Sequence, residues 1–100
     1  MKKIISICSA LFIVTFVKAA SQDTIPFVHD PVMAYENGIY HIYSTGQNIA
    51  EMTSVDRRHW TIHRGGLLHT IPVWTHRIPD FKNHIWAPDV IRWHGKWWMA

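Results

Sequence analysis

The sequence contains a single cysteine, Cys8, in 100 residues. One cysteine cannot form an intrachain disulfide, so a small scaffold held together by disulfide bonds is excluded. Cys8 also lies within an apolar run near the start, ahead of the segment that carries the folding signals. The folded part must therefore be stabilised by apolar packing and hydrogen bonds alone.

Charged residues are also sparse, at 17% of the chain, and no basic stripe is present. The densest basic cluster is the pair Arg57-Arg58, and the formal net charge is only +3. A surface that binds nucleic acid gathers Lys and Arg on one face, so we expect no nucleic-acid partner. With 48% hydrophobic residues and six Trp, the composition is that of a globular protein rather than a disordered one.

No apolar run is long enough to favour a membrane span. The longest, residues 4–17, has about 14 residues, whereas a helix needs roughly 20 to cross a bilayer. It follows Lys2 and Lys3 and ends in small residues at Ala19, which is the arrangement of a secretory signal. We predict a cleaved signal peptide at 1–19, with a membrane anchor as the alternative. Residues 20–100 would then be secreted or periplasmic, without membrane contact.

Beyond residue 20, no segment has the apolar spacing of an amphipathic helix, and short alternating runs of β-branched and aromatic residues recur instead. We predict an all-β fold. The Asn37-Gly38 pair provides the positive φ angles of a tight hairpin turn. The expected strands form an antiparallel meander at 31–35, 39–44, 49–55 and 60–64.

The pattern of this first hairpin then recurs near the end of the chain. Asp30 and Gly38 in "DPVMAYENGIYHI" are matched by Asp89 and Gly95 in "DVIRWHGKWWMA". A four-stranded unit that repeats at this period predicts a β-propeller, although two hairpins can also resemble each other by chance. Because a propeller needs at least four blades, we expect this chain to be the N-terminal part of a longer protein.

Asp30 is the first candidate catalytic residue. It precedes Pro31, which should hold it in extended geometry on a stiff backbone at the start of the innermost strand. A carboxylate there could serve as a catalytic base. The residues alone leave a second role open, and favour it: acceptance of backbone hydrogen bonds in a turn.

Eight His residues raise the question of a metal, but their spacing does not support one. Only His59 and His63 have a spacing of interest, and they span a turn and a strand, so we expect no metal site.

Residues 65–88 form a long link between blades. Its aromatic residues Trp74, Phe81 and Trp86 are candidates for a ligand surface, because such links cover the axis of a propeller.

Several motifs together resemble the opening of glycoside hydrolase family 43 enzymes. They are "VHDPVMAYENGIYHIYSTG", "SVDRRHW", "PVWTH", "HIWAPDV" and "HGKWWMA", in the same order and at similar distances as in that family. The resemblance covers nearly all of residues 25–100. Within the family, "STG" and "HIWAPDV" are most similar to endo-1,5-α-L-arabinanases.

The resemblance implies a five-bladed β-propeller, of which this chain holds the first blade and the first hairpin of the second. It implies an inverting hydrolase of α-1,5-L-arabinan or a related arabinose- or xylose-containing plant polysaccharide or oligosaccharide. Asp30 matches the family's general base. The general acid, a glutamate, and a second aspartate belong to later blades, so this fragment alone should be inactive.

The resemblance also suggests substrate-binding residues. Trp86 of "WAPD" would line the sugar cleft, although an inter-blade core position is equally open. Trp60, Trp93, Trp97 and Trp98 are more simply explained by blade packing. His29 could contact substrate or be a satisfied turn residue, and Asp89, at the repeat position of Asp30, is expected to be structural.

No cofactor is expected for the chemistry. The resemblance allows a structural calcium ion on the propeller axis of the full-length protein. The alternative function is a non-catalytic sugar-binding propeller, which needs the aromatic cleft but not a pair of carboxylates.

Overall fold

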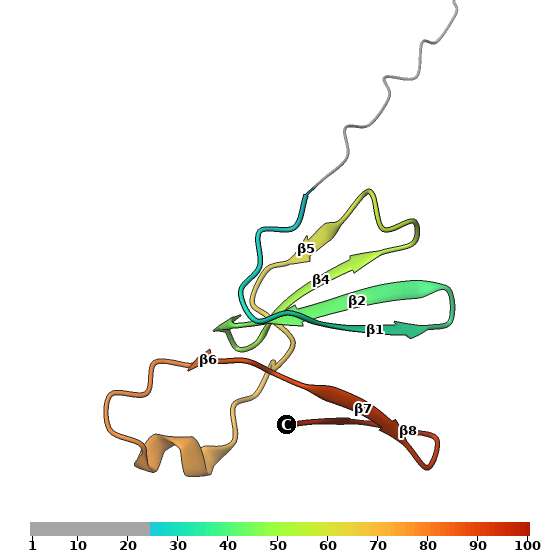
Figure 1. The fold of residues 1–100 in the computed structure, drawn as a ribbon. Helices are drawn as coiled ribbons and strands as arrows, with labels where there is room; N and C mark the ends of the chain where they lie inside the picture. Colours follow the sequence, from blue (N-terminus) through green and yellow to red (C-terminus); the bar gives the residue numbers. More distant parts are fainter. Residues whose placement is uncertain (1–24) are drawn as a thin grey trace, which may run out of the picture.

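The computed structural model describes residues 25–100, so the signal peptide predicted at 1–19 lies outside the described residues. Within them the fold is all-β apart from one short 3-10 helix. One antiparallel sheet follows chain order as a meander (Figure 1). Its strands are β1 (Val32–Glu36), β2 (Ile39–Ser44), β4 (Ala50–Ser54) and β5 (Thr61–His63).

The first hairpin confirms the prediction made from its turn residues. Asn37 and Gly38 have φ angles of 50° and 82°, as a two-residue turn between right-twisted strands requires. The second strand has the expected bounds, and the other three differ from expectation by one residue at each end. The local signals therefore determined the meander.

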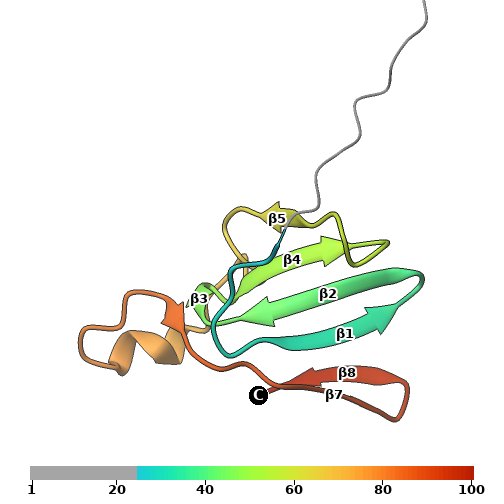
Figure 2. The same ribbon diagram turned by 45° about the horizontal axis from the view of Figure 1, so that its top comes forward.

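A second hairpin lies beside β1 and repeats the first (Figures 1 and 2). It consists of β7 (Val90–Trp93) and β8 (Lys96–Met99), and its turn residues His94 and Gly95 have φ angles of 48° and 74°. Arg92 of this hairpin forms an ion pair with Glu36 of β1, with an Nη1 to Oε1 distance of 3.6 Å. The repeat expected from the sequence is thus a structural one.

The register of that repeat differs from the one expected. Asp30 and Ala87 both lie eight residues before the turn glycine, both precede a proline, and both have positive φ angles, 48° and 46°. Ala87, not Asp89, is therefore the structural counterpart of Asp30. Asp89 instead extends the β7–β8 ladder through two backbone hydrogen bonds to Ala100, and its carboxylate accepts the Val90 amide at 2.8 Å. The structural role expected for Asp89 agrees with these contacts.

The space between the sheet and the second hairpin is partly polar. A cavity of about 300 Å³ lies there, and its lining includes Glu36, His41, Tyr43, Trp97 and Trp98. His41 and Glu51 are in contact, with Nδ1 and Oε1 3.3 Å apart. Burial, with Glu51 and Glu36 nearby, raises the pKa of the Tyr43 phenol, so this hydroxyl stays protonated at neutral pH.

Few apolar side chains are fully covered among the described residues. The buried ones are Ala34, Ile49, Met52 and Pro88, whereas Trp93, Trp97 and Trp98 remain 38% to 58% exposed. Trp60 is half-buried and donates its indole N–H to the Arg57 carbonyl at 3.2 Å. Packing against further blades stays a prediction for the three exposed tryptophans.

The β4–β5 turn explains the "SVDRRHW" motif. The Ser54 hydroxyl oxygen accepts the amides of Asp56 and Arg57, at 3.2 and 2.8 Å. Asp56 Oδ1 accepts the amides of Arg58 and His59, both at 2.8 Å, and Oδ2 contacts His59 Nδ1 at 2.5 Å. These contacts, led by the one to the His59 side chain, hold the pKa of Asp56 well below its ordinary value of 3.8. The motif therefore builds a turn rather than a ligand site.

This turn should make stability depend on pH in the acid range. Because the folded-state pKa of Asp56 is depressed, its contribution to stability is present at pH values well above 3.8 and is lost as the pH falls from there toward the folded-state pKa. We expect the difference in unfolding free energy between wild type and Asp56→Ala to shrink as the pH falls below 3.8. Chemical denaturation of both proteins at a series of pH values measures it, and a difference that stays constant as pH falls would contradict the assignment.

Candidate functional site

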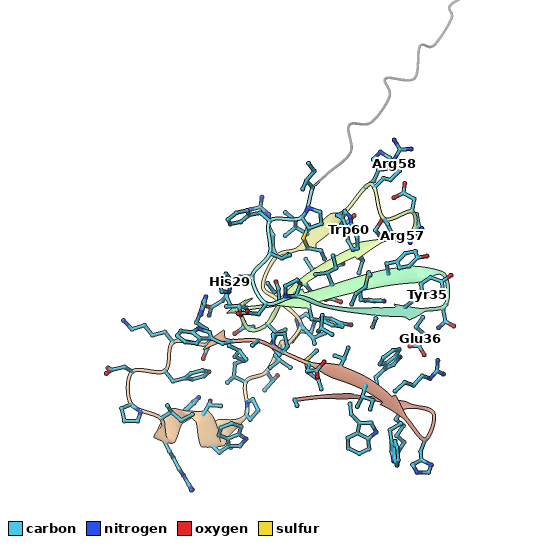
Figure 3. The ribbon with its side chains drawn as sticks, in the orientation of Figure 1. His29, Tyr35, Glu36, Arg57, Arg58 and Trp60 are labelled. Carbon is cyan, nitrogen blue, oxygen red and sulfur yellow. The ribbon has the colours of Figure 1, made fainter. Side chains whose placement is uncertain are left out.

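The strand registers bring three loops to one end of the four-stranded sheet. Val32 pairs with Tyr43, Ser44 with Ala50, and Glu51 with His63. The segment before β1, the loop between β2 and β4, and the segment after β5 therefore meet at the same end. Figure 3 shows His29 at that end, with Tyr35 and Glu36 at the opposite one.

Asp30 lies at this end with its side chain held through one oxygen. The Oδ2 atom contacts His29 Nδ1 at 2.8 Å and accepts a hydrogen bond from the Thr45 hydroxyl at 3.3 Å. Within residues 25–100, Oδ1 has no hydrogen-bond partner. The side chain is 51% exposed. The half-exposed carboxylate is thus held at Oδ2, and Oδ1 is free of protein partners among the described residues.

The backbone of Asp30 is not extended, contrary to the expectation from Pro31. Its φ angle of 48° lies in the left-handed region, which Asp tolerates better than most residues because its short polar side chain bonds locally. The rule that a residue before proline avoids the right-handed helical region still holds. The stiffness of Asp30 therefore comes from its hydrogen bonds and not from an extended chain.

Thr45 connects the segments around Asp30, and the sequence analysis did not single it out. It directly follows β2, where its amide donates to the His29 carbonyl at 3.0 Å. Its hydroxyl oxygen accepts the Ala87 amide at 2.9 Å, across 42 residues of sequence. The "STG" motif was the available signal, but a motif does not show which of its atoms make contact.

A small second sheet brings the link between blades to the same place. Its strands β3 (Gly46–Gln47) and β6 (His84–Ile85) are antiparallel, with Gly46 opposite Ile85. The Asn48 amide donates to the Asn83 carbonyl at 2.7 Å. The 3-10 helix η1 (Val73–Arg77) lies earlier in the link and projects away from the main sheet in Figures 1 and 2.

Trp86 follows β6 directly and is 75% exposed. Its indole N–H donates to His84 Nδ1 at 2.7 Å, and the two rings meet edge to face with centroids 6.4 Å apart. The indole is therefore oriented by His84 while most of its surface remains accessible. Among the described residues it is not a core tryptophan.

The start of the link packs tightly on the loop after β3. Leu67 and Leu68 donate their amides to the carbonyls of Ile49 and Asn48, at 2.9 and 3.0 Å. Asn48 Nδ2 donates to the Gly65 carbonyl at 3.0 Å. Gly66 lies between these contacts with a φ angle of 75°, and a Cβ atom there would collide with the carbonyl oxygens of Gln47, Asn48 and Ile49.

Residues 25–100 contain no group of three or more His, Cys, Asp or Glu side chains that could hold a metal. His59 contacts Asp56, and His63 Nε2 is 2.7 Å from the Thr53 hydroxyl, so these two histidines have separate partners. In the same residues, no helix has the length and apolar character needed to cross a membrane.

Comparison with known proteins finds relatives that match most of this chain, although no family model matches it. An extracellular exo-α-(1→5)-L-arabinofuranosidase of Cellvibrio japonicus is 37% identical over 73 residues, which are 72% of this chain and 21% of the relative. The chain thus spans about a fifth of the length of this relative.

Solved structures agree with the sequence comparison. An exo-1,5-α-L-arabinanase from a bovine ruminal metagenomic library is 47% identical, with a TM-score of 0.67 over 74% of this chain and 25% of that one. A family 43 endo-arabinanase from Bacillus licheniformis is 26% identical, with a TM-score of 0.63 over 79% of this chain and 29% of that one. The chain is homologous to glycoside hydrolase family 43 arabinanases.

The homology confirms the fold expected from the repeat. Family 43 arabinanases are five-bladed β-propellers. The described residues correspond to a first blade and the opening hairpin of a second. Both exo- and endo-acting arabinanases are among the relatives, and the exo-acting ones named above have the higher identities.

Proposed function

We propose that this chain is part of a secreted inverting glycoside hydrolase that cleaves α-1,5-L-arabinan or a related arabinose- or xylose-containing plant polysaccharide. Asp30 is its general base. The observation that carries the proposal is the half-exposed Asp30 carboxylate, which is held through Oδ2 and whose Oδ1 has no hydrogen-bond partner within residues 25–100. A general base needs this combination of fixed position and free acceptor.

In this mechanism, Asp30 Oδ1 accepts a proton from a water molecule as that water attacks the anomeric carbon. A carboxylic acid on the other side of the sugar protonates the leaving oxygen, and in inverting enzymes the two carboxyl groups are about 6.5 to 9.5 Å apart. The acid, a glutamate, and a second aspartate belong to later blades. Residues 20–100 alone should therefore lack activity.

Trp86 is the proposed sugar platform. Its exposed indole can pack against the apolar face of an arabinose ring, and its bond to His84 fixes the orientation of the ring. The contact of His29 with Asp30 and its 83% exposed side chain suit a residue that meets substrate at the rim of the site. Both roles follow the family resemblance of "HDP" and "WAPD".

The names of the relatives support the substrate and the location. The relatives named above are arabinanases or arabinofuranosidases, and the Cellvibrio protein is named as extracellular. The hydrolysis itself uses water and two carboxyl groups and needs no cofactor. A calcium ion on the propeller axis of the full-length protein would have a structural role, and none of the site residues named above is proposed to bind it.

The stereochemistry of the product tests the reaction class. The full-length protein is incubated with linear α-1,5-arabinan, and proton NMR follows the anomeric configuration of the first product. We expect sugar of the opposite configuration to the bond cleaved. Product that first retains the configuration would overturn the inverting mechanism. Binding of arabinan without any cleavage would instead support the sugar-binding propeller, which needs the aromatic cleft but not a pair of carboxylates.

Substitution of Trp86 separates the sugar platform from a packing role. In the full-length protein, Trp86→Ala should weaken binding of arabino-oligosaccharide by about 1 to 3 kcal/mol and leave unfolding nearly unchanged, because the indole is mostly exposed. Calorimetric titration and thermal unfolding of the same variant measure the two effects. As the matched control, Trp60→Ala should lower stability and leave binding intact, since Trp60 is half-buried at the β4–β5 turn. A stability loss of about 3 to 5 kcal/mol in Trp86→Ala would identify a core residue instead.

A further inference from the structure

Thr45 makes three hydrogen bonds to segments that carry the proposed site. Its amide donates to the His29 carbonyl at 3.0 Å, its hydroxyl donates to Asp30 Oδ2 at 3.3 Å, and its hydroxyl oxygen accepts the Ala87 amide at 2.9 Å. We propose that Thr45 is a positioning residue that holds the Asp30 carboxylate and the Trp86-bearing segment in one fixed arrangement. This inference rests on the proposed function.

The chemistry of the partners fixes the direction of these bonds. An amide can only donate, so the Ala87 N–H must point at the Thr45 oxygen. An ionised carboxylate can only accept, so the single hydroxyl hydrogen must point at Asp30. The hydroxyl thus links a donor on one side to an acceptor on the other, and each bond polarises the next.

The same oxygen of Asp30 receives both of its contacts. His29 Nδ1 and the Thr45 hydroxyl both contact Oδ2, which leaves Oδ1 without a partner within residues 25–100. Without the Thr45 hydroxyl, Oδ2 keeps only the contact to His29, whose side chain is 83% exposed. The carboxylate would then rotate more freely, and Oδ1 would spend less time in the position for proton transfer.

The bond to Ala87 extends this effect to the second blade. Ala87 is adjacent to Trp86 and has a φ angle of 46°, a left-handed conformation that is unfavourable for alanine. Such a conformation persists when surrounding contacts determine it, and the Thr45 oxygen is the acceptor for the Ala87 amide. Thr45 therefore connects the proposed base of one blade with the sugar platform of the next.

Two substitutions isolate the hydroxyl group. Thr45→Val keeps the shape and the backbone bond to His29 but removes the hydroxyl, and Thr45→Ser keeps the hydroxyl. Thr53→Val is the matched control, because Thr53 also uses its hydroxyl, with His63, on the β4–β5 pair. In the full-length protein we measure kcat and KM on linear arabino-oligosaccharide, together with hydrogen exchange of the Ala87 amide.

We expect kcat of Thr45→Val to fall by about 10- to 100-fold, the range found for hydrogen-bond partners that orient metal ligands, with little change in KM. Its Ala87 amide should exchange faster than in wild type. Thr45→Ser should restore most of the activity and the protection, and Thr53→Val should resemble wild type in both measurements.

Normal kcat in Thr45→Val, or a Thr45→Ser variant as slow as Thr45→Val, would overturn the positioning role. Loss of kcat with unchanged exchange at Ala87 would overturn the connection to the second blade. A wild-type protein that cleaves no arabinan would overturn the proposed function, and exchange at Ala87 in the Val and Ser variants would still decide whether the hydroxyl holds this segment.

Discussion

Replacement of Asp30 by Asn should lower kcat on linear arabinan by several orders of magnitude in the full-length protein. The amide keeps the size of the side chain but cannot take a proton from water, and loss of a general base commonly costs about 10²- to 10⁴-fold or more. The fold should be preserved, because Asn tolerates the left-handed backbone observed at this position. Steady-state kinetics measure the effect, with KM expected to change little.

An external nucleophile makes this test specific to the base. Azide is an anion that attacks without deprotonation, so it should restore part of the lost rate in Asp30→Asn and give an inverted product. Asp89→Asn is the matched control, because the Asp89 carboxylate accepts the Val90 amide and takes no part in the proposed chemistry. Near-normal turnover in Asp30→Asn would leave Asp30 as a turn residue.

Gly66→Ala should be the most destabilising single methyl addition among the described glycines. The new Cβ would meet three carbonyl oxygens that cannot move without breaking the loop after β3, and alanine also disfavours the φ angle of 75°. Together these effects should lower the unfolding free energy by about 2 to 5 kcal/mol. Denaturant unfolding of the full-length protein measures the change.

Gly95→Ala separates the collision of the new Cβ with its neighbours from the cost of the positive φ angle. Gly95 has a φ angle of 74°, almost the same as Gly66, but nothing lies within 4 Å of its Cβ position. Its substitution should therefore cost only the backbone term, about 1 to 2 kcal/mol. Equal losses of unfolding free energy in the two variants would show that the atoms around Gly66 move to accept the methyl group. The tight packing of the link would then contribute little to stability.

The sequence predicted the meander well because its signals are local. Asn37 and Gly38 define a turn, and alternating residues on both sides of it define the paired strands. The second hairpin was found for the same reason. The alignment of the two hairpins from sequence was wrong by two residues at this position. It matched Asp30 with Asp89 by residue type, whereas the backbone places Ala87 at the position equivalent to Asp30.

The contacts that assemble the site could not be predicted in the same way. β3 and β6 have two residues each, too few to show a periodic pattern, and they are separated in sequence by β4, β5 and most of the link. The bond from Ala87 to Thr45 likewise joins residues far apart in sequence. The family resemblance pointed to Asp30, His29 and Trp86, but only the arrangement in space shows that Thr45 contacts His29, Asp30 and the residue after Trp86.

The left-handed backbone at position 30 has a consequence for which amino acids this position can accept. Most side chains are disfavoured there, and the residue types that adopt this conformation most readily are glycine, asparagine and aspartate. Of these three, only aspartate carries an ionisable group. The shape of the main chain and the proposed proton transfer thus favour the same residue at this position.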